Sequence, residues 1–267
     1  HGTYVAATLP DTASTPTPGA SYAPPVQVST DGRTWTVAAG IPAGATVTAL
    51  VQGSRKTVWA AVLGSGVFRS TDEGRHWSVA IPARIPITAL AVAGDNLVLA
   101  TDSGILVTGT SSPSMPALPQ LAATVDDLEL SPRCAACLVA TLPHGGVATS
   151  DNGGVSWKRN PFRVTFESVA APADVPGALI GMSPSPSKRS QGLWRSTDNG
   201  VTWRRVLSAP LVDHLYDVPA HGSQPAELLA FQWGIQVYSS GDGGRTWQRV
   251  AKAGGVPAGA AMAATPA

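Results

Sequence analysis

The chain has 267 residues, of which 43% are hydrophobic and 13% charged, so it can bury a substantial core. Its formal net charge of +1 gives no general field that would attract nucleic acid or an anionic membrane surface. Its apolar runs are strand-sized, well short of the roughly 18 residues of a membrane-spanning helix, and 28 Gly with 23 Pro favour short strands joined by tight turns.

One phrase, Ser-x-Asp-x-Gly-x-x-Trp, recurs along the chain. Its five copies occupy residues 29–35, 70–77, 149–157, 196–203 and 239–247. The steps between successive tryptophans are 42, 80, 46 and 44 residues, and the step of 80 is twice about 40. Self-similarity at this period indicates a repeat architecture. We therefore expect six repeats, one of which has lost the phrase.

Each repeat contains four strand-like segments. The first strand is expected at 46–51, 87–92, 125–130, 166–171 and 215–220, and the second at 57–63, 96–101, 137–142, 178–182 and 227–233. The second run is almost continuously apolar, which predicts burial on both faces. A third strand begins with Gly at 66–70, 104–108, 146–150, 192–196 and 234–240. The Asp-Gly phrase then has the chemistry of a hairpin turn, and its Trp begins the fourth strand.

Four antiparallel strands per repeat, without helical periodicity, predict an all-β, six-bladed β-propeller that forms a single domain over 1–267. The N-terminal segment 3–9 matches a second strand, so the first blade lacks its inner strand. Segment 256–264 resembles 41–49 and is expected to supply that strand and close the ring. The expected blades are 3–38 with 256–264, 46–80, a degenerate 87–120, 124–160, 165–207 and 214–251.

The phrase resembles the Asp-box, or BNR repeat, of sialidases, sortilin-type receptor propellers, xyloglucan-hydrolysing propellers and photosystem II stability/assembly factors. Three copies match its spacing, one is a residue short and one a residue long. The resemblance implies a structural hairpin at the blade periphery, away from any active site. The implied structural residues are Asp31, Trp35, Asp72, Trp77, Asp151, Trp157, Asp198, Trp203, Asp242 and Trp247. The alternative, a Ca²⁺ loop, would need more carboxylates than the one or two in each box.

A sialidase-type hydrolase is the alternative function. Such an enzyme would need three substrate-binding arginines and a Tyr nucleophile paired with Glu. The Arg84–Pro86 segment resembles the sialidase arginine motif but follows a box instead of preceding the first one. Glu73 lies inside a box, and Tyr216 with Glu167 is the best remaining pair. Carboxylates at a glycosidase separation cannot be identified, so we expect no catalytic residues, no metal and no cofactor.

A binding site is expected on the face that the boxes avoid. The loops between second and third strands share this face, and function concentrates in loops on a rigid scaffold. Their candidate binding residues are Tyr22, His144, Lys188, Arg189 and Trp233. We expect these loops to bind a protein partner or a sugar, in a scaffold or accessory subunit that is a monomer by itself or part of a hetero-complex.

The two cysteines, Cys134 and Cys137, form a lone CxxC. Two ligands are too few for a structural zinc site, and no haem-attachment His follows. A redox CxxC normally opens a helix, and none is expected here. The pair is expected to be a local disulfide or two free thiols in a surface loop. A first residue other than Met suggests a processed, extracytoplasmic protein, although a trimmed terminus explains it equally well.

Overall fold

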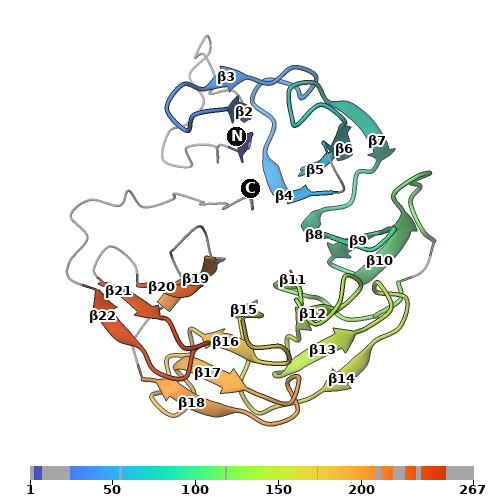
Figure 1. Cartoon of the computed structure of the whole chain (residues 1–267). Helices are drawn as coiled ribbons and strands as arrows, with labels where there is room; N and C mark the ends of the chain where they lie inside the picture. The colour runs from blue at the N-terminus through green and yellow to red at the C-terminus, as the bar shows by residue number, and fades with distance from the viewer. Residues whose placement is uncertain are drawn as a thin grey trace.

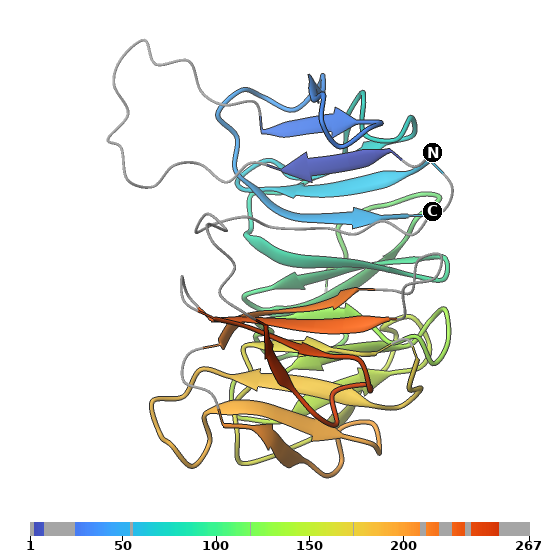
Figure 2. The same ribbon diagram turned by 60° about the vertical axis from the view of Figure 1, so that its left-hand side comes forward.

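The computed structural model describes residues 3–7, 25–53, 56–117, 119–172, 174–208, 212–218, 226–232 and 236–250. These ranges contain twenty-two β-strands and no helix. The strands form six antiparallel sheets that follow one another around a centre (Figure 1). Figure 2 shows that the strands run between the same two faces of the ring. In the described part of the chain, no helix has the length and apolarity needed to cross a membrane.

The first three sheets have three, four and three strands. The first is β1 (Tyr4–Ala7), β2 (Val26–Ser29) and β3 (Thr36–Val37). The second is β4 (Val47–Gln52), β5 (Val58–Val62), β6 (Gly66–Ser70) and β7 (Ser78–Pro82). The third is β8 (Ile87–Ala93), β9 (Asn96–Thr101) and β10 (Gly104–Gly109). Residues 110–120, where the phrase was missing, contain no described strand.

The last three sheets each have four strands in chain order. The fourth is β11 (Leu128–Leu130), β12 (Leu138–Thr141), β13 (Val147–Ser150) and β14 (Lys158–Asn160). The fifth is β15 (Ser168–Ala170), β16 (Leu179–Ser183), β17 (Gly192–Ser196) and β18 (Arg204–Leu207). The sixth is β19 (Val212–Val218), β20 (Glu227–Gln232), β21 (Gln236–Ser240) and β22 (Gln248–Val250). The expected closing strand, 256–264, lies outside the described residues.

The core is divided among the seams between neighbouring sheets. Along β5, Val58 and Ala60 pack toward the first sheet, whereas Trp59 and Ala61 pack toward the third. This alternation follows from the period of two along a strand. All five residues of β5 are buried, as the near-continuous apolar pattern of the second strands predicted. Three further apolar clusters fill the seams between the third and fourth, fourth and fifth, and fifth and sixth sheets.

The five copies of the phrase are called boxes and take the numbers of their sheets, so there are a first, second, fourth, fifth and sixth box. They form tight turns held by a hydroxyl and a side-chain oxygen acceptor. In the second box, Ser70 Oγ donates to Asp72 Oδ1 at 2.8 Å and accepts the Gly74 N–H at 2.9 Å. Asp72 also accepts the backbone N–H of His76 at 2.9 Å. The same Ser–Asp bond and capped N–H recur at Asp31, Asp198 and Asp242. Burial raises the pKa of Asp242, but hydrogen bonds from Thr246 and Ser240 outweigh it and lower that pKa to about 2.

The fourth box departs from the prediction, because Asn152 and not Asp151 occupies the capping position. Ser150 Oγ donates to Asn152 Oδ1 at 3.0 Å, and Asn152 Oδ1 accepts the Ser156 N–H at 3.0 Å. The reason is backbone geometry: the residue after the capping one has a positive φ, and here that residue is Gly153 at 69°. This box therefore keeps the standard length with Asn in place of Asp.

The box tryptophans are anchored unequally. The indole Nε1 atoms of Trp77, Trp157 and Trp203 donate to the carbonyl of the last box glycine at 2.7, 2.8 and 2.9 Å. Trp247 packs into the apolar seam between the fifth and sixth sheets, but its Nε1 has no partner among the described residues. Trp35 is instead 39% exposed. Its box is one residue shorter, which shifts the indole relative to the turn.

Each full-length box also contacts the preceding sheet. The missing Cβ of Gly74 faces Val5 and Val28 of the first sheet, and that of Gly154 faces Val98 and Val107 of the third. Polar side chains of the preceding sheet bond to the same turns: Asn96 Nδ2 to Gly153 O at 3.1 Å, Asn160 Nδ2 to Asn199 O at 3.1 Å and Arg195 Nε to Gly243 O at 2.8 Å. The boxes therefore join each sheet to the one before it.

The assignment of Asn152 can be tested directly. We expect Asn152→Ala to lower the free energy of unfolding by about 1–2 kcal/mol, because a buried hydroxyl and a backbone N–H lose their acceptor. Asp151→Ala removes an exposed carboxylate of the same turn and should leave stability within about 0.5 kcal/mol of the wild type. Urea unfolding of both variants measures the difference, and the reverse order would restore Asp151 as the capping residue.

Candidate functional site

The binding residues were predicted in the loops between second and third strands of the repeats. The structure describes three of them, His144, Lys188 and Arg189, and all three are exposed. His144 lies in the turn between β12 and β13, and Lys188 with Arg189 lies in the loop between β16 and β17. Tyr22 and Trp233 fall outside the described residues, so their part in this face stays a prediction.

The loop between β16 and β17 is fixed by its own hydrogen bonds. Ser190 Oγ donates to Ser185 Oγ at 2.8 Å, and the N–H groups of Ser190 and Gln191 bond to Ser187 O at 3.0 and 2.9 Å. From the sheet below, Trp194 Nε1 donates to Ser190 O at 2.8 Å. The loop therefore presents Lys188 and Arg189 on a preformed backbone, which lowers the ordering cost of binding.

A third cation belongs to this loop, which the sequence alone did not identify. Arg205 Nη1, from β18, donates to Lys188 O at 2.6 Å, and its guanidinium lies 6.0 Å from the ring centre of Trp194. No carboxylate of the described residues forms an ion pair with Lys188, Arg189 or Arg205. The ion pairs in the described part of the chain all use the carboxylates of the second box. The loop is thus a cationic surface without an internal counter-charge.

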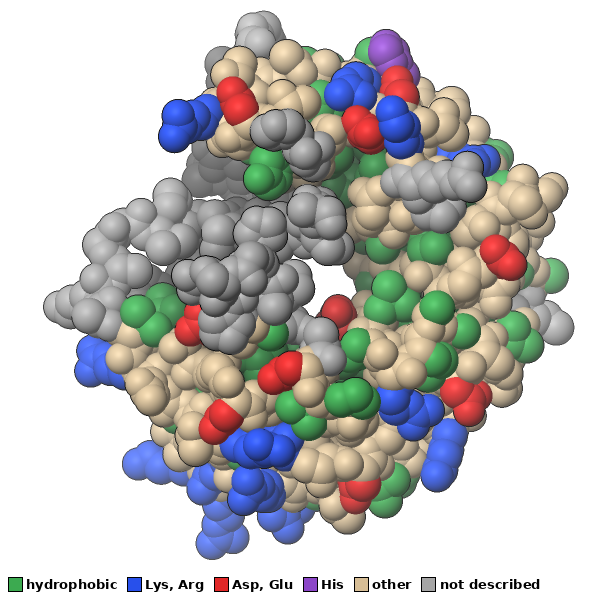
Figure 3. Space-filling view, in the orientation of Figure 1, with side chains coloured by type: hydrophobic (Ala, Val, Ile, Leu, Met, Phe, Trp, Pro, Cys, Tyr) green, Lys and Arg blue, Asp and Glu red, His purple; other side chains and the backbone are tan. Residues whose placement is uncertain are grey.

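Further arginines extend the positive charge along the outer edge of the last two sheets. Figure 3 shows Lys and Arg side chains gathered over the part of the ring where β17, β18 and β22 lie. The exposed arginines of these strands and of the sixth box are Arg204, Arg205, Arg245 and Arg249. Arg195 is instead buried, and burial lowers the pKa of its guanidinium, with Arg245 and Arg204 adding repulsion.

The residues considered for a sialidase do not form a site in the described part of the chain. Arg84 is exposed between β7 and β8. Glu73 is engaged in its box, where it accepts Thr3 Oγ1 at 2.8 Å and pairs with Arg75 at 3.1 Å. Glu167 is exposed immediately before β15, and the side chain of Tyr216 lies outside what the structure describes. The Tyr216–Glu167 pair therefore stays a prediction.

Asp127, immediately before β11, is a carboxyl with an altered pKa. Burial raises its pKa, while the N–H of Val169 opposes that shift. Its Oδ2 accepts the Val169 N–H at 2.8 Å and its Oδ1 accepts the Leu128 N–H at 2.9 Å. Since Val169 lies in β15, this carboxyl bridges the fourth and fifth sheets and acts as a structural link. Among the described residues, no group of His, Cys, Asp or Glu has the arrangement of a metal site.

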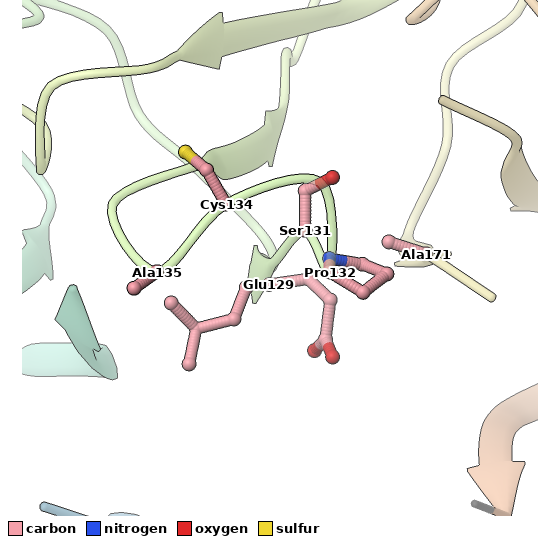
Figure 4. Close-up of a pocket in the computed structure, with 7 residues that line it drawn as sticks. Glu129, Ser131, Pro132, Cys134, Ala135 and Ala171 are labelled. Atoms are coloured by element: carbon pink, nitrogen blue, oxygen red, sulfur yellow. The ribbon is translucent and has the colours of Figure 1, made fainter. Parts of the chain in front are cut away.

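A hollow of about 350 Å³ opens beside β11, at the loop that leads to β12 (Figure 4). Its lining includes Glu129, Leu130, Ser131, Pro132, Cys134, Ala135 and Ala171. The Gly153 N–H of the fourth box bonds to Ala136 O of this loop at 2.9 Å. The hollow therefore lies on the face that carries the boxes, where we expected no site.

The comparisons with known proteins show the fold of the chain but no family to which it belongs. No family model matches the chain, and no curated protein matches it either. Among solved structures, an ancestral GH74 enzyme superposes with a TM-score of 0.61 at 19% identity, covering 80% of this chain and 32% of that enzyme. The chain is a β-propeller. The predicted all-β propeller is thereby confirmed, whereas the six-bladed closure by segment 256–264 stays a prediction.

Two non-GH74 structures resemble the propeller equally well. YCF48 bound to a D1 peptide superposes with a TM-score of 0.62 at 20% identity, covering 85% of this chain and 75% of that protein. BBS1N in complex with ARL6DN gives 0.61 at 14% identity, covering 81% and 69%. The propeller thus resembles a glycoside hydrolase and proteins in complex with a peptide or protein, while spanning only a third of the enzyme's length.

Proposed function

We propose that this propeller is a non-catalytic binding module, a scaffold or accessory subunit, that holds an acidic segment of a protein partner. The observation that carries the proposal is the preformed loop between β16 and β17, which presents Lys188 and Arg189 beside Arg205 without an ion-pairing carboxylate among the described residues. Arginine on a rigid surface is a common anchor of protein interfaces. His144, and Tyr22 and Trp233 from the neighbouring loops, complete the proposed face.

Two further observations support this proposal over a hydrolase. The chain covers 75% of YCF48 but 32% of the GH74 enzyme, so the likeness extends over most of a peptide-bound propeller and a minor part of an enzyme. The carboxyl of Asp127 is used in a link between sheets, and Glu73 is used in a box. The disulfide between Cys134 and Cys137 supports an extracytoplasmic location, since disulfides persist in oxidising compartments.

Charge reversal at the loop tests the proposal. Proteins captured from a native extract by the wild type should be lost, by at least about tenfold, with Lys188→Glu/Arg189→Glu, since unpaired interface charges are costly. Arg33→Glu/Lys158→Glu reverses two exposed charges elsewhere and should capture the same proteins. Equal capture by both variants would contradict the proposed face. Hydrolysis of a sialoside or xyloglucan by the wild type would favour the glycan-acting alternative.

A further inference from the structure

The disulfide between Cys134 and Cys137 is asymmetric in its exposure. Cys134 is exposed and lines the hollow beside β11, whereas Cys137 is only 3% exposed. Thiol–disulfide exchange requires a thiolate to reach one sulfur while the other leaves. Cys134 therefore presents the only sulfur of this pair that an external thiolate can readily approach, and Figure 4 shows it at the edge of the loop.

The loop keeps its shape through bonds that do not involve sulfur. Ser131 N donates to Cys137 O at 2.8 Å and Cys137 N to Cys134 O at 3.1 Å. Two neighbours hold it from outside, since Gly94 N donates to Ala135 O and Gly153 N to Ala136 O, both at 2.9 Å. A crosslink across a sequence separation of 3 closes a very short loop, so it removes little entropy from the unfolded chain. A need for stability therefore does not account for this disulfide.

The surroundings suit a leaving thiolate. Arg133 Nη2 lies 3.9 Å from Cys137 Sγ, and a neighbouring cation stabilises a thiolate. The sequence argued against redox chemistry because no helix N-terminus follows the CxxC, but the guanidinium supplies the positive charge that a helix would have provided. Cys137 is thus placed as the leaving sulfur when Cys134 is attacked.

The hollow beside Cys134 offers a contact for a polypeptide. Its lining includes the apolar side chains of Leu130, Pro132 and Ala171 next to the exposed Cys134. An apolar residue beside the cysteine of a bound peptide would bury its surface against these side chains. The Oγ of Ser131 is itself buried, so it is not part of this contact.

We propose that Cys134–Cys137 is a thiol–disulfide exchange site for a cysteine-containing peptide segment. The peptide thiolate attacks Cys134 Sγ, a peptide–Cys134 disulfide forms, and the bond to Cys137 breaks with its electron pair leaving on Cys137 Sγ beside Arg133. A second thiolate then attacks the peptide sulfur, which releases Cys134 as a thiolate; the peptide thiol and the second thiol are together oxidised to a disulfide, and the protein disulfide is reduced to two thiolates. This site lies on the box face and does not depend on the cationic loop.

The wild type provides the first test. The native protein is treated with millimolar dithiothreitol, quenched with N-ethylmaleimide and analysed by mass spectrometry, with and without denaturant. We expect reduction within minutes under native conditions, with circular dichroism unchanged. A disulfide that becomes reducible only on unfolding would overturn the proposal.

Two single-cysteine variants identify the attacked sulfur. With glutathione disulfide as probe, Cys137→Ser, which keeps the exposed Cys134, should form the mixed disulfide about 50-fold faster than Cys134→Ser, because accessibility controls exchange. In Cys137→Ser, the further change Arg133→Gln leaves Cys134 exposed and serves as the matched control for charge. Equal rates for the two single variants would overturn the assignment of Cys134, whether or not the wild type is reducible.

Discussion

Replacing Gly200 with alanine is expected to lower the free energy of unfolding by about 3 kcal/mol, the sum of left-handed backbone strain and overpacking. Gly200 is the glycine of the fifth box and has a φ of 87°, where an L side chain is strained. A Cβ at this position would also overlap Val147 Cγ2 in the preceding sheet. Because the box is a contact between sheets, the new methyl group cannot move outward. Urea unfolding followed by tryptophan fluorescence measures the loss.

Gly177 provides the matched control in the same sheet. Its φ is 84°, so alanine meets a comparable backbone strain, but nothing lies within 4 Å of its missing Cβ. Gly177→Ala should therefore cost only about 1 kcal/mol, the strain term alone. If both variants lose the same free energy of unfolding, the contact with Val147 does not contribute to stability and the boxes are ordinary turns.

The positions of the strands could be predicted from the sequence because burial in a propeller is periodic and local. Val58, Ala60 and Val62 alternate with Trp59 and Ala61 between two seams, and this pattern can be read from five consecutive letters. The turn at Asn152 could not be read in the same way, since the Asp beside it matched the phrase better. Counting back from Trp157 to Gly154 gives the correct position, because the Gly-x-x-Trp spacing is what the backbone geometry fixes.

The sites were less accessible to sequence reasoning, because they depend on contacts between distant residues. Lys188 was identified from its loop, but Arg205 lies in β18, seventeen residues further along the chain, and donates a hydrogen bond to the Lys188 backbone carbonyl. The exposure of Cys134 depends on how the loop after β11 lies against Gly94 and Gly153. Gly94 and Gly153 are both distant from the CxxC in the sequence, so the spacing of the two cysteines did not predict the exchange site.

The seam between the fourth and fifth sheets is expected to be the most sensitive part of the core. Phe166 is fully buried there, with its ring centre 4.5 Å from that of Trp203 and 6.3 Å from that of Phe162. Gly181 leaves room for it, since an added Cβ there would lie 2.6 Å from Phe166 Cδ1. Phe166→Ala should therefore cost about 3–5 kcal/mol, because the removed ring leaves a cavity that the two sheets cannot close.

Phe162 is the control for this prediction, as it belongs to the same aromatic cluster but is only partly buried. Phe162→Ala should cost about 1–2 kcal/mol, since water can replace part of its ring and less apolar area is lost. Thermal unfolding of both variants separates the two cases. Equal losses would mean that the aromatic cluster acts through ring contacts alone and not through the filling of the seam. A larger loss of stability at Phe162 would mean that its contact with Trp194, whose ring centre lies 5.5 Å away, contributes more than the buried ring of Phe166.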